Sequence, residues 1–293
     1  MCRSINHYIA SVWLIIHLFC ILPTNSKVSA EDNVKKLLPI PDKLVVLTFD
    51  DANKSDRTFV AEIVKKHEFG ATFYVTEGLG FLKNKNHYTT WAEIRELDRM
   101  GFEIGNHTQH HRNVTRLSRE QLIASIKHID GRCAEYGIRK PITFCYPGFS
   151  NNLNAVRVLE ELKCQFARRG VRPEFPDGGN GARGPAYDPE RDHPLLVPTT
   201  GYAGPKWGFE DLKWAVDQAR DGNICILCFH GVPALEHPWV NTKPADFEKY
   251  MQYLKDQGCT VIAMRDLVRY VDPSRRPRDP YAPIKVRKKL LNN

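Results

Sequence analysis

The chain of 293 residues lacks an apolar stretch long enough to cross a membrane as a helix. Its most apolar run covers residues 9–22, whereas a membrane-spanning helix needs about 20 residues. The run follows a short polar start containing Arg3, and Pro23 and a small-residue segment ending at Ala30 come after it. This organisation is typical of a secretory signal peptide, so we expect residues 1–30 to be removed and the protein to be secreted, periplasmic or at the cell surface. The alternative is an uncleaved signal that anchors the protein to the membrane.

The main body of the chain also lacks net charge, although the whole sequence carries +8. Residues 1–30 contribute +2 and residues 273–293 contribute +6, which leaves residues 31–272 neutral. A neutral body gives no evident sign of a nucleic-acid-binding surface, so we expect no nucleic-acid partner. The basic tail, residues 273–293, is either a solvated, disordered end or a segment in weak contact with an anionic surface.

The cysteines do not include a convincing redox-active pair. Cys225 and Cys228 have the spacing of a redox pair, but they lie in an apolar run that predicts a strand. Residues three apart in a strand point to opposite faces and lie about 10 Å apart, too far for a disulfide. We expect most of the cysteines after the signal peptide to be small buried apolar residues. They are Cys133, Cys145, Cys164, Cys225, Cys228 and Cys259.

Internal repeats are absent, and short apolar runs alternate with amphipathic stretches, as in repeated βα units. The expected strands are residues 44–49, 71–75, 102–106, 142–146, 164–167, 195–197, 224–230 and 259–263. The expected helices are residues 56–67, 91–100, 117–136, 151–162, 209–221, 244–257 and 265–271. The alternation predicts a single α/β domain, a distorted and incomplete (β/α) barrel, with an open doubly wound sheet as the alternative.

One segment, residues 170–208, departs from the alternation because it is rich in proline and glycine. We expect a long loop here, and loops of this length are usually functional or disordered. The predicted organisation is therefore a lead-in over residues 31–42, a barrel over residues 43–272 that contains this loop, and the basic tail.

A Ser-His-Asp signature and the glutamate of a zinc-protease HExxH motif are both missing, but metal-ligand residue types are present. Asp50 and Asp51 end the apolar run of residues 44–49, and His107 and His111 follow the segment at residues 102–106. Two imidazoles and one carboxylate suit a borderline divalent metal and leave positions for water and substrate. The remaining carboxylate is a candidate general base.

The same residues, with His230 and Tyr146, all follow predicted strands at their carboxyl ends. In barrels and open α/β sheets that rim carries the active site. Each motif alone has an ordinary explanation, such as a turn, a solvated helix face or a buried histidine. Together they predict a metal-assisted hydrolase.

Four ordered motifs resemble those of the polysaccharide deacetylase family, the NodB-homology domain of carbohydrate esterase family four. They are Thr48-Phe49-Asp50-Asp51, His107-Thr108-Gln109-His110-His111, Tyr146-Pro147-Gly148 and Leu227-Cys228-Phe229-His230. The resemblance covers about residues 43–271 and implies hydrolysis of N- or O-acetyl groups on a sugar polymer.

The resemblance also implies a role for each matching residue. Asp50 would be the catalytic base and His230 the general acid, while Asp51, His107 and His111 would hold the metal. The substrate would contact Tyr146, Pro147, Gly148 and Leu227, with Leu227 lining the acetyl pocket and the Gly148 N–H facing the oxyanion. His110 has no motif role.

The third motif departs from the family pattern. Cys145 or Phe144 stands where members often carry an arginine that orients the base. Arg168, which follows the next predicted strand, is the candidate replacement, and Arg169 is expected to matter less. The alternative is that both are surface arginines in a loop.

For the cofactor we expect a divalent metal, with zinc as the first choice and cobalt, nickel or another divalent ion as alternatives. The expected partner is an acetylated glycan. Two alternatives stay open: an amidohydrolase of the same fold that acts on a small amide or cyclic imide, and a catalytically inactive carbohydrate-binding module.

Overall fold

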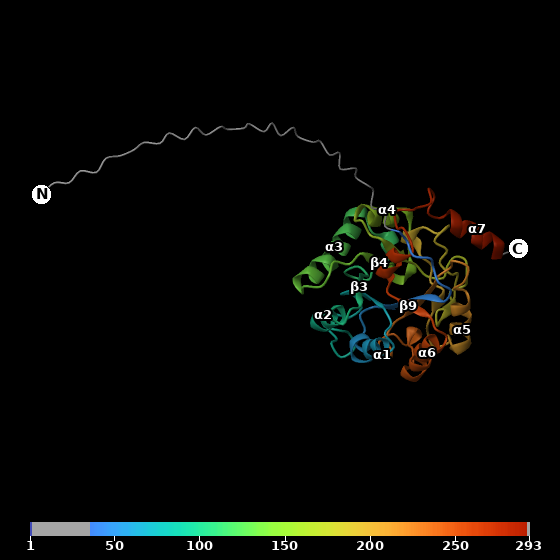
Figure 1. The fold of residues 1–293 in the computed structure, drawn as a ribbon, viewed down its shortest axis with the longest axis horizontal. Helices are drawn as coiled ribbons and strands as arrows, with labels where there is room; N and C mark the ends of the chain where they lie inside the picture. The colour runs from blue at the N-terminus through green and yellow to red at the C-terminus, as the bar shows by residue number, and fades with distance from the viewer. Residues whose placement is uncertain (2–35, 292–293) are drawn as a thin grey trace, which may run out of the picture. The chain divides into compact units, whose positions relative to one another are not determined.

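The computed structural model describes Met1 and residues 36–291 (Figure 1). Beyond Met1, the predicted signal peptide therefore lies outside the described residues. Within the described part, none of the helices combines the length and the apolar character that crossing a bilayer requires.

The centre of the fold is one curled sheet in the order β5-β4-β3-β2-β1-β8-β7-β6, and β9 also pairs with β1. The strands are β1 (Leu44–Asp50), β2 (Thr72–Val75), β3 (Glu103–Asn106), β4 (Thr143–Cys145), β5 (Phe166–Arg168), β6 (Ala182–Arg183), β7 (Gly201–Tyr202), β8 (Cys225–Phe229) and β9 (Thr260–Ile262). All pairs are parallel except β6 with β7. This is the predicted distorted and incomplete (β/α) barrel.

The longest strand, β1, is fully buried and has neighbours on both edges. β8 runs along it from Val45 to Phe49. The other edge is shared, since β9 pairs with Leu44–Val46 and β2 pairs with Thr48–Asp50. Central parallel strands buried on both faces are expected to be continuously apolar, as this one is up to its last residues.

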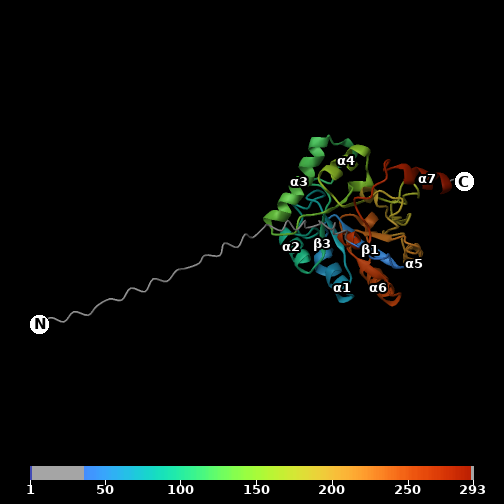
Figure 2. The same cartoon turned by 45° about the horizontal axis from the view of Figure 1, so that its top comes forward.

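Helices cover the outer face of the sheet (Figures 1 and 2). The α-helices are α1 (Ala61–Lys66), α2 (Trp91–Arg99), α3 (Arg119–Glu135), α4 (Leu153–Glu161), α5 (Phe209–Asp217), α6 (Pro244–Asp256) and α7 (Ala282–Leu291). In both views α1 lies near α6 and α3 lies near α4, which the residue contacts also show. A single-turn π-helix, η1 (Asp56–Val60), precedes α1.

Strand alternation divides the buried residues into two layers. Val45, Leu47 and Phe49 of β1 pack in the core cluster that includes residues of α1, α2, α5 and α6. Leu44 and Val46 pack in a separate cluster inside the curl of the sheet. Because side chains alternate along a strand, Asp50 has the same orientation as Leu44 and Val46 and faces the interior.

Sequence periodicity predicts most elements to within one or two residues. Helix α5 is an exception, because it ends at Asp217, four residues before the end expected for the helix at residues 209–221. The expected strand at residues 195–197 is instead a 3₁₀ turn, η4 (Pro194–Leu196), whose first residue is a proline. The expected helix at residues 265–271 is also 3₁₀, η6 (Met264–Arg269). The predicted loop at residues 170–208 contains η4 and the two-residue strands β6 and β7, so only part of it is irregular.

The basic tail differs most from expectation. Residues 282–291 form α7, and Ile284 on this helix is buried in the cluster around α4. The described part of the tail is therefore docked on the body rather than a solvated end.

The six described cysteines are all unpaired, and four of them are buried. Cys225 packs in the helix-side cluster and Cys228 in a different cluster, so the two point to opposite faces of β8 as expected.

Candidate active site

The carboxyl end of β1 presents two carboxylates in succession. The chain turns sharply there, with Asp51 at φ 77° and Ala52 at φ 54°, a left-handed conformation that is uncommon outside glycine. The Asn53 side chain stabilises the turn by donating from Nδ2 to the Asp50 carbonyl oxygen over 2.9 Å. This turn separates the two carboxylates, so that each meets different partners.

Two strands away, the end of β3 leads into the loop that carries the histidines. His107 is buried, and its Nδ1 donates to the Cys145 carbonyl oxygen at 2.8 Å. That hydrogen bond fixes the ring and leaves the Nε2 lone pair available, as in histidines that bind metals. His111 follows with φ 52° and keeps its side chain 20% exposed.

Asp51, His107 and His111 converge on one point. Asp51 Oδ1 lies 3.4 Å from His107 Nε2 and 3.3 Å from His111 Nε2. Ligands held about 2.1 Å from a tetrahedral metal are about 3.4 Å apart, so the spacing fits a zinc-like ion. Asp51 Oδ1 is also buried without a hydrogen-bond partner, which a bound cation would resolve. The three residues therefore form a candidate divalent metal site.

The protonation states of His111 and Asp51 also favour metal binding at this site. Burial lowers the pKa of His111 to about 4, so its ring is neutral and able to bind metal at physiological pH. Burial alone would raise the pKa of the Asp51 carboxyl, but the neighbouring histidines hold that pKa well below its usual range.

A second candidate ligand set shares His107 and adds Asp50 and Cys145. Arg168 Nη2 lies 2.5 Å from Asp50 Oδ2 and 2.9 Å from Cys145 Sγ, so a fixed cation already occupies this side. Burial also raises the pKa of the Cys145 thiol well above its usual value, although metal binding requires the thiolate. The Asp51 set is the better metal site.

Asp50 is held by Arg168. The Arg168 guanidinium reaches both carboxylate oxygens, at 2.6 and 2.5 Å, and both side chains are almost completely buried. Burial raises the pKa of Asp50, but the charges of Arg168, His107 and His230 outweigh burial and keep that pKa below its usual value. The thiols of Cys145 and Cys228 lie 3.4 and 3.7 Å from Asp50 Oδ2.

His230 follows β8 and faces the same two carboxylates. Its Nε2 is 4.0 Å from Asp50 Oδ2 and 3.8 Å from Asp51 Oδ2. Burial lowers the pKa of His230, so the neutral ring is favoured until a proton donor or a negative charge approaches.

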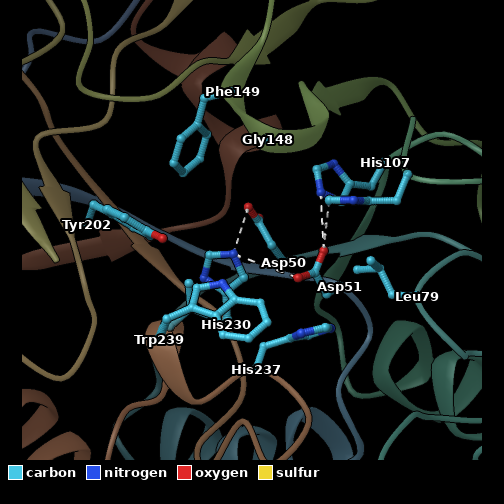
Figure 3. Close-up of a pocket in the computed structure, with 12 residues that line it drawn as sticks. Asp50, Asp51, Leu79, His107, Gly148, Phe149, Tyr202, His230, His237 and Trp239 are labelled. Atoms are coloured by element: carbon cyan, nitrogen blue, oxygen red, sulfur yellow. Dashed lines mark ion pairs between the residues drawn. The ribbon is translucent and has the colours of Figure 1, made fainter. Parts of the chain in front are cut away.

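These groups surround a cavity of about 160 Å³ (Figure 3). In the figure, Phe149, Tyr202 and Trp239 border one side of His230, and His107 and Leu79 lie on the other side of Asp51. The full lining is Asp50, Asp51, Leu79, His107, His111, Gly148, Phe149, Tyr202, His230, His237, Trp239 and Val240. No sequence motif points to Leu79, Phe149, Tyr202, His237, Trp239 or Val240, and none of them is expected from the sequence.

Among the residues expected to contact substrate, only Gly148 lines this cavity. Tyr146 packs with Phe144 in the cluster around α4, and its hydroxyl donates to the Leu195 carbonyl oxygen over 2.9 Å. Leu227 belongs to the helix-side core, and Pro147 is buried. Strand alternation explains the difference for two of them, because inward Cys145 and Cys228 have outward neighbours in Tyr146 and Leu227.

Burial decides the remaining expectations, which concern His110, Arg168 and Arg169. His110 is exposed and does not line the cavity, as its lack of a motif role suggested. Arg168 and Arg169 are both buried, which excludes the alternative of surface arginines.

Comparison with known proteins places this geometry in a family. The family model described as polysaccharide deacetylase matches residues 38–167. A peptidoglycan-N-acetylglucosamine deacetylase of Bacillus cereus is 30% identical over 240 residues, which is 80% of this chain and 92% of that protein. The chain belongs to the polysaccharide deacetylase family.

Solved structures agree with the fold of this deacetylase. A family 4 acetyl xylan esterase from Clostridium thermocellum, in complex with a cobalt ion, has a TM-score of 0.53 at 22% identity over 79% of this chain and 95% of that one. The peptidoglycan deacetylase PdaC from Bacillus subtilis has a TM-score of 0.50 at 17% identity over 79% of this chain and 92% of that one.

Membership fixes the general activity. The deacetylase is a hydrolase that removes acetyl groups from carbohydrates, and the family uses a divalent metal.

Proposed function

We propose that this deacetylase is a zinc enzyme that removes the N-acetyl group from N-acetylglucosamine units of a peptidoglycan-type polymer outside the cytoplasm. The main support for this proposal is the cluster of candidate metal ligands, Asp51, His107 and His111. Beside it lies the Asp50 carboxylate, which is held by Arg168. The bacterial relative that matches most of this chain has this activity, which supports the same bond and sugar here.

Asp51, His107 and His111 would hold the metal. Two imidazoles and a carboxylate, with the remaining position open, are a ligand set that catalytic zinc uses. A divalent cation held there supplies a Lewis acid that polarises the acetyl carbonyl and lowers the pKa of water.

Asp50 would act as the general base and remove a proton from the attacking water. Its carboxylate is ionised at neutral pH because its pKa is below the usual value. Arg168 binds both oxygens and so restricts the rotation of the carboxylate, which makes it an orienting residue. Cys145 is small enough to leave space for the Arg168 guanidinium, which contacts its sulfur.

His230 would donate a proton to the leaving amine nitrogen from its imidazolium form, which the charges of Asp51 and Asp50 favour against burial. It lines the same cavity as Asp50 and comes from the neighbouring strand, so the base and the acid both face the space that the acetyl group would enter. Gly148 also lines the cavity, and its N–H is the candidate donor to the oxyanion.

The rim of the cavity suits a sugar. Trp239 is 53% exposed although it borders the cavity, and Tyr202 and Phe149 add aromatic surface beside it. An exposed aromatic face next to polar catalytic groups is a usual means of binding amphipathic ligands. Residues 43–272 would form this catalytic domain, and export through the signal peptide would bring it to the polymer.

The test is hydrolysis of N-acetylglucosamine polymers, acetylated xylan and small cyclic imides by zinc-loaded protein, measured as acetate release from the glycans and as ring opening of the imides. We expect release from the N-acetylated glycans, and Asp50→Asn should keep its zinc while turnover falls by about 10² or more. Turnover of the imide alone would identify the small-amide alternative, and inactivity on every substrate would support a binding module.

A further inference from the structure

A buried ionic cluster joins the C-terminal helix to the loop that follows β5. Its members, here called the arginine clasp, are Arg169, Glu174, Asp192 and Arg287. Arg169 Nη2 and Nη1 lie 2.6 and 2.9 Å from the two Glu174 carboxylate oxygens. Arg287 on α7 binds Glu174 Oε1 at 3.1 Å and Asp192 Oδ1 at 2.5 Å.

The clasp has no net charge and is mostly buried. Arg169, Glu174 and Asp192 side chains are at most 2% exposed, and two cations face two carboxylates. Arg287 is 22% exposed and is the member that comes from the tail. Without Arg287, Glu174 would keep Arg169, but Asp192 would lose its ion pair inside the protein, a costly arrangement.

Contacts along the tail hold α7 in place. Ile284 is 5% exposed, and the Tyr281 hydroxyl donates to Asn151 Oδ1 at 2.9 Å. Arg275 and Arg276 form ion pairs with Glu190 and Glu160 of the body. With Lys285, which pairs with Asp279, four of the seven cations of the tail thus have carboxylate partners within the described part of the protein.

The clasp is directly connected to Arg168. Arg168 and Arg169 are consecutive at the end of β5 and point in opposite directions, one to Asp50 and the other to Glu174. Thr199 joins them, since its Oγ1 accepts from Arg168 Nη1 at 3.0 Å and donates to the Arg169 carbonyl oxygen at 2.6 Å. The Arg169 N–H also donates to the Val197 carbonyl oxygen at 2.8 Å.

We infer that Arg287 is a positioning residue for catalysis: through Glu174 and Arg169 it fixes the end of β5, and thereby the Arg168 guanidinium that orients Asp50. This inference rests on the proposed roles of Asp50 and Arg168. Helix α7, which the sequence suggests is a basic tail, would then help to hold the active-site residues in place, although it does not line the cavity.

The inference is tested by a double-mutant cycle between Arg287→Ala and Arg168→Lys, assayed as acetate release on a good substrate. Arg287→Ala should lower kcat by about tenfold with KM and bound zinc unchanged, the scale of coupling carried through a packed network. In the Arg168→Lys background, Arg287→Ala should lower kcat by less than twofold, because the group it positions is already altered. A merely structural role would give independent, multiplicative losses.

Two further variants control the measurement. Lys288→Ala, on the same helix and exposed, should leave kcat unchanged. Arg287→Lys keeps the charge but not the planar fork, so it should restore part of kcat, and it replaces Arg287→Ala if that variant does not fold.

The failures are distinguishable. If Arg168→Lys itself leaves kcat unchanged, the proposed role of Arg168 is wrong. If Arg168→Lys lowers kcat while folded Arg287→Ala and Arg287→Lys do not, or if the two losses multiply, the inference about Arg287 is overturned and the proposed function stands.

Discussion

At the scale of single residues, Asp50 is contacted by an arginine that comes from a different strand than the family resemblance suggests. The side chain of Cys145 lies 3.4 Å from Asp50, in the place where an arginine is expected by family resemblance. Arg168 reaches Asp50 from the next strand, β5, whose Arg168 pairs in register with Cys145 of β4. A positive charge therefore lies beside Asp50, the proposed base, although the arginine comes from β5 and not from the third motif.

We predict that replacing His107 weakens metal binding and that replacing His110, three residues later, does not. His107→Ala removes an imidazole from the Asp51 cluster, so bound zinc and activity should both fall by about 10-fold or more, the scale of losing one metal ligand contact. His110→Ala is the matched control, because His110 is exposed, and it should keep both within about twofold. Elemental analysis of the purified proteins decides, and full zinc in His107→Ala would contradict the assignment.

Much of the site could be predicted at this scale because several acidic and imidazole groups follow predicted strands at the same carboxyl-terminal rim. The expected residues Asp50, Asp51, His107, His111 and His230 all line the cavity. The aromatic rim could not be predicted, since Trp239 and Tyr202 lie in short segments whose path no local pattern determines.

At the scale of elements, the loop after β2 supports the loop after β3. The Glu77 N–H donates to the Gln109 carbonyl oxygen at 3.0 Å. Gly78 lies so close to the histidine loop that a Cβ added there would be 2.7 Å from the carbonyl carbon of His110 and 3.0 Å from the Cβ of His111. Glycine at this position leaves room for His111 to approach Asp51 in the candidate metal site.

Gly78→Ala should therefore displace His111 and weaken zinc binding by about 10- to 100-fold, without abolishing folding. Gly131→Ala is the control, since a Cβ there meets nothing within 4 Å on helix α3. The control should leave zinc affinity unchanged and raise stability by about 0.5–1 kcal/mol. Competition with a zinc chelator measures both affinities, and equal values for the two variants would refute the proposed steric role of Gly78.

A second element-scale prediction concerns acid stability. His193 caps η4, with Nδ1 accepting from the Leu195 N–H at 3.1 Å, which requires the neutral ring. Burial lowers the pKa of His193 to about 4, with Arg276 acting in the same direction and Glu160 against it. In the unfolded chain the ring takes up a proton near pH 6.5, so its contribution to stability is complete above that pH and is lost as the pH falls toward about 4.

His193→Asn keeps an acceptor for the cap but does not titrate. Between pH 7 and pH 4 the free energy of unfolding should therefore fall less for this variant than for the wild type, by about 1–3 kcal/mol. Urea denaturation at the two pH values gives the difference, and parallel losses in the two proteins would show that His193 does not titrate in this range.

Elements are predictable from sequence only when they are long enough to repeat a pattern. Helix α2 is an example, with Trp91, Ile94 and Leu97 buried and a capping box at Thr90. The strands β6 and β7 have two residues each and cannot show alternation. Alternation along β8, however, does place Leu227 with Cys225 and Phe229 on the helix side, so its absence from the cavity follows from a pattern already present in the sequence.

At the scale of the whole molecule, the curled parallel sheet brings the ends of β1, β3 and β8 to one rim. This is why motifs far apart along the chain predict a single site, since each of them follows a strand at its carboxyl end. The docking of α7 could not be predicted in the same way, because Arg287 resembles its basic neighbours and only the buried carboxylates of Glu174 and Asp192 distinguish it.

Because the candidate metal ligands follow two different strands, β1 and β3, a bound metal should stabilise the entire fold. Zinc at about 100 times its Kd adds about 2.7 kcal/mol if it binds only the folded chain, so dialysis against a chelator should lower Tm by several degrees. Asp51→Asn should show a Tm that is nearly independent of zinc. A wild-type Tm unaffected by saturating zinc would argue against the site.

The hydrogen bond that fixes His107 ends on a main-chain oxygen, that of Cys145. Every amino acid supplies that oxygen, so a mutation at position 145 cannot delete the bond unless it moves the strand. The side chain at the same position contacts Asp50 and Arg168 instead. We therefore expect a substitution at position 145 to change turnover while His107, a candidate metal ligand, stays anchored, so that metal binding and catalysis can be altered separately.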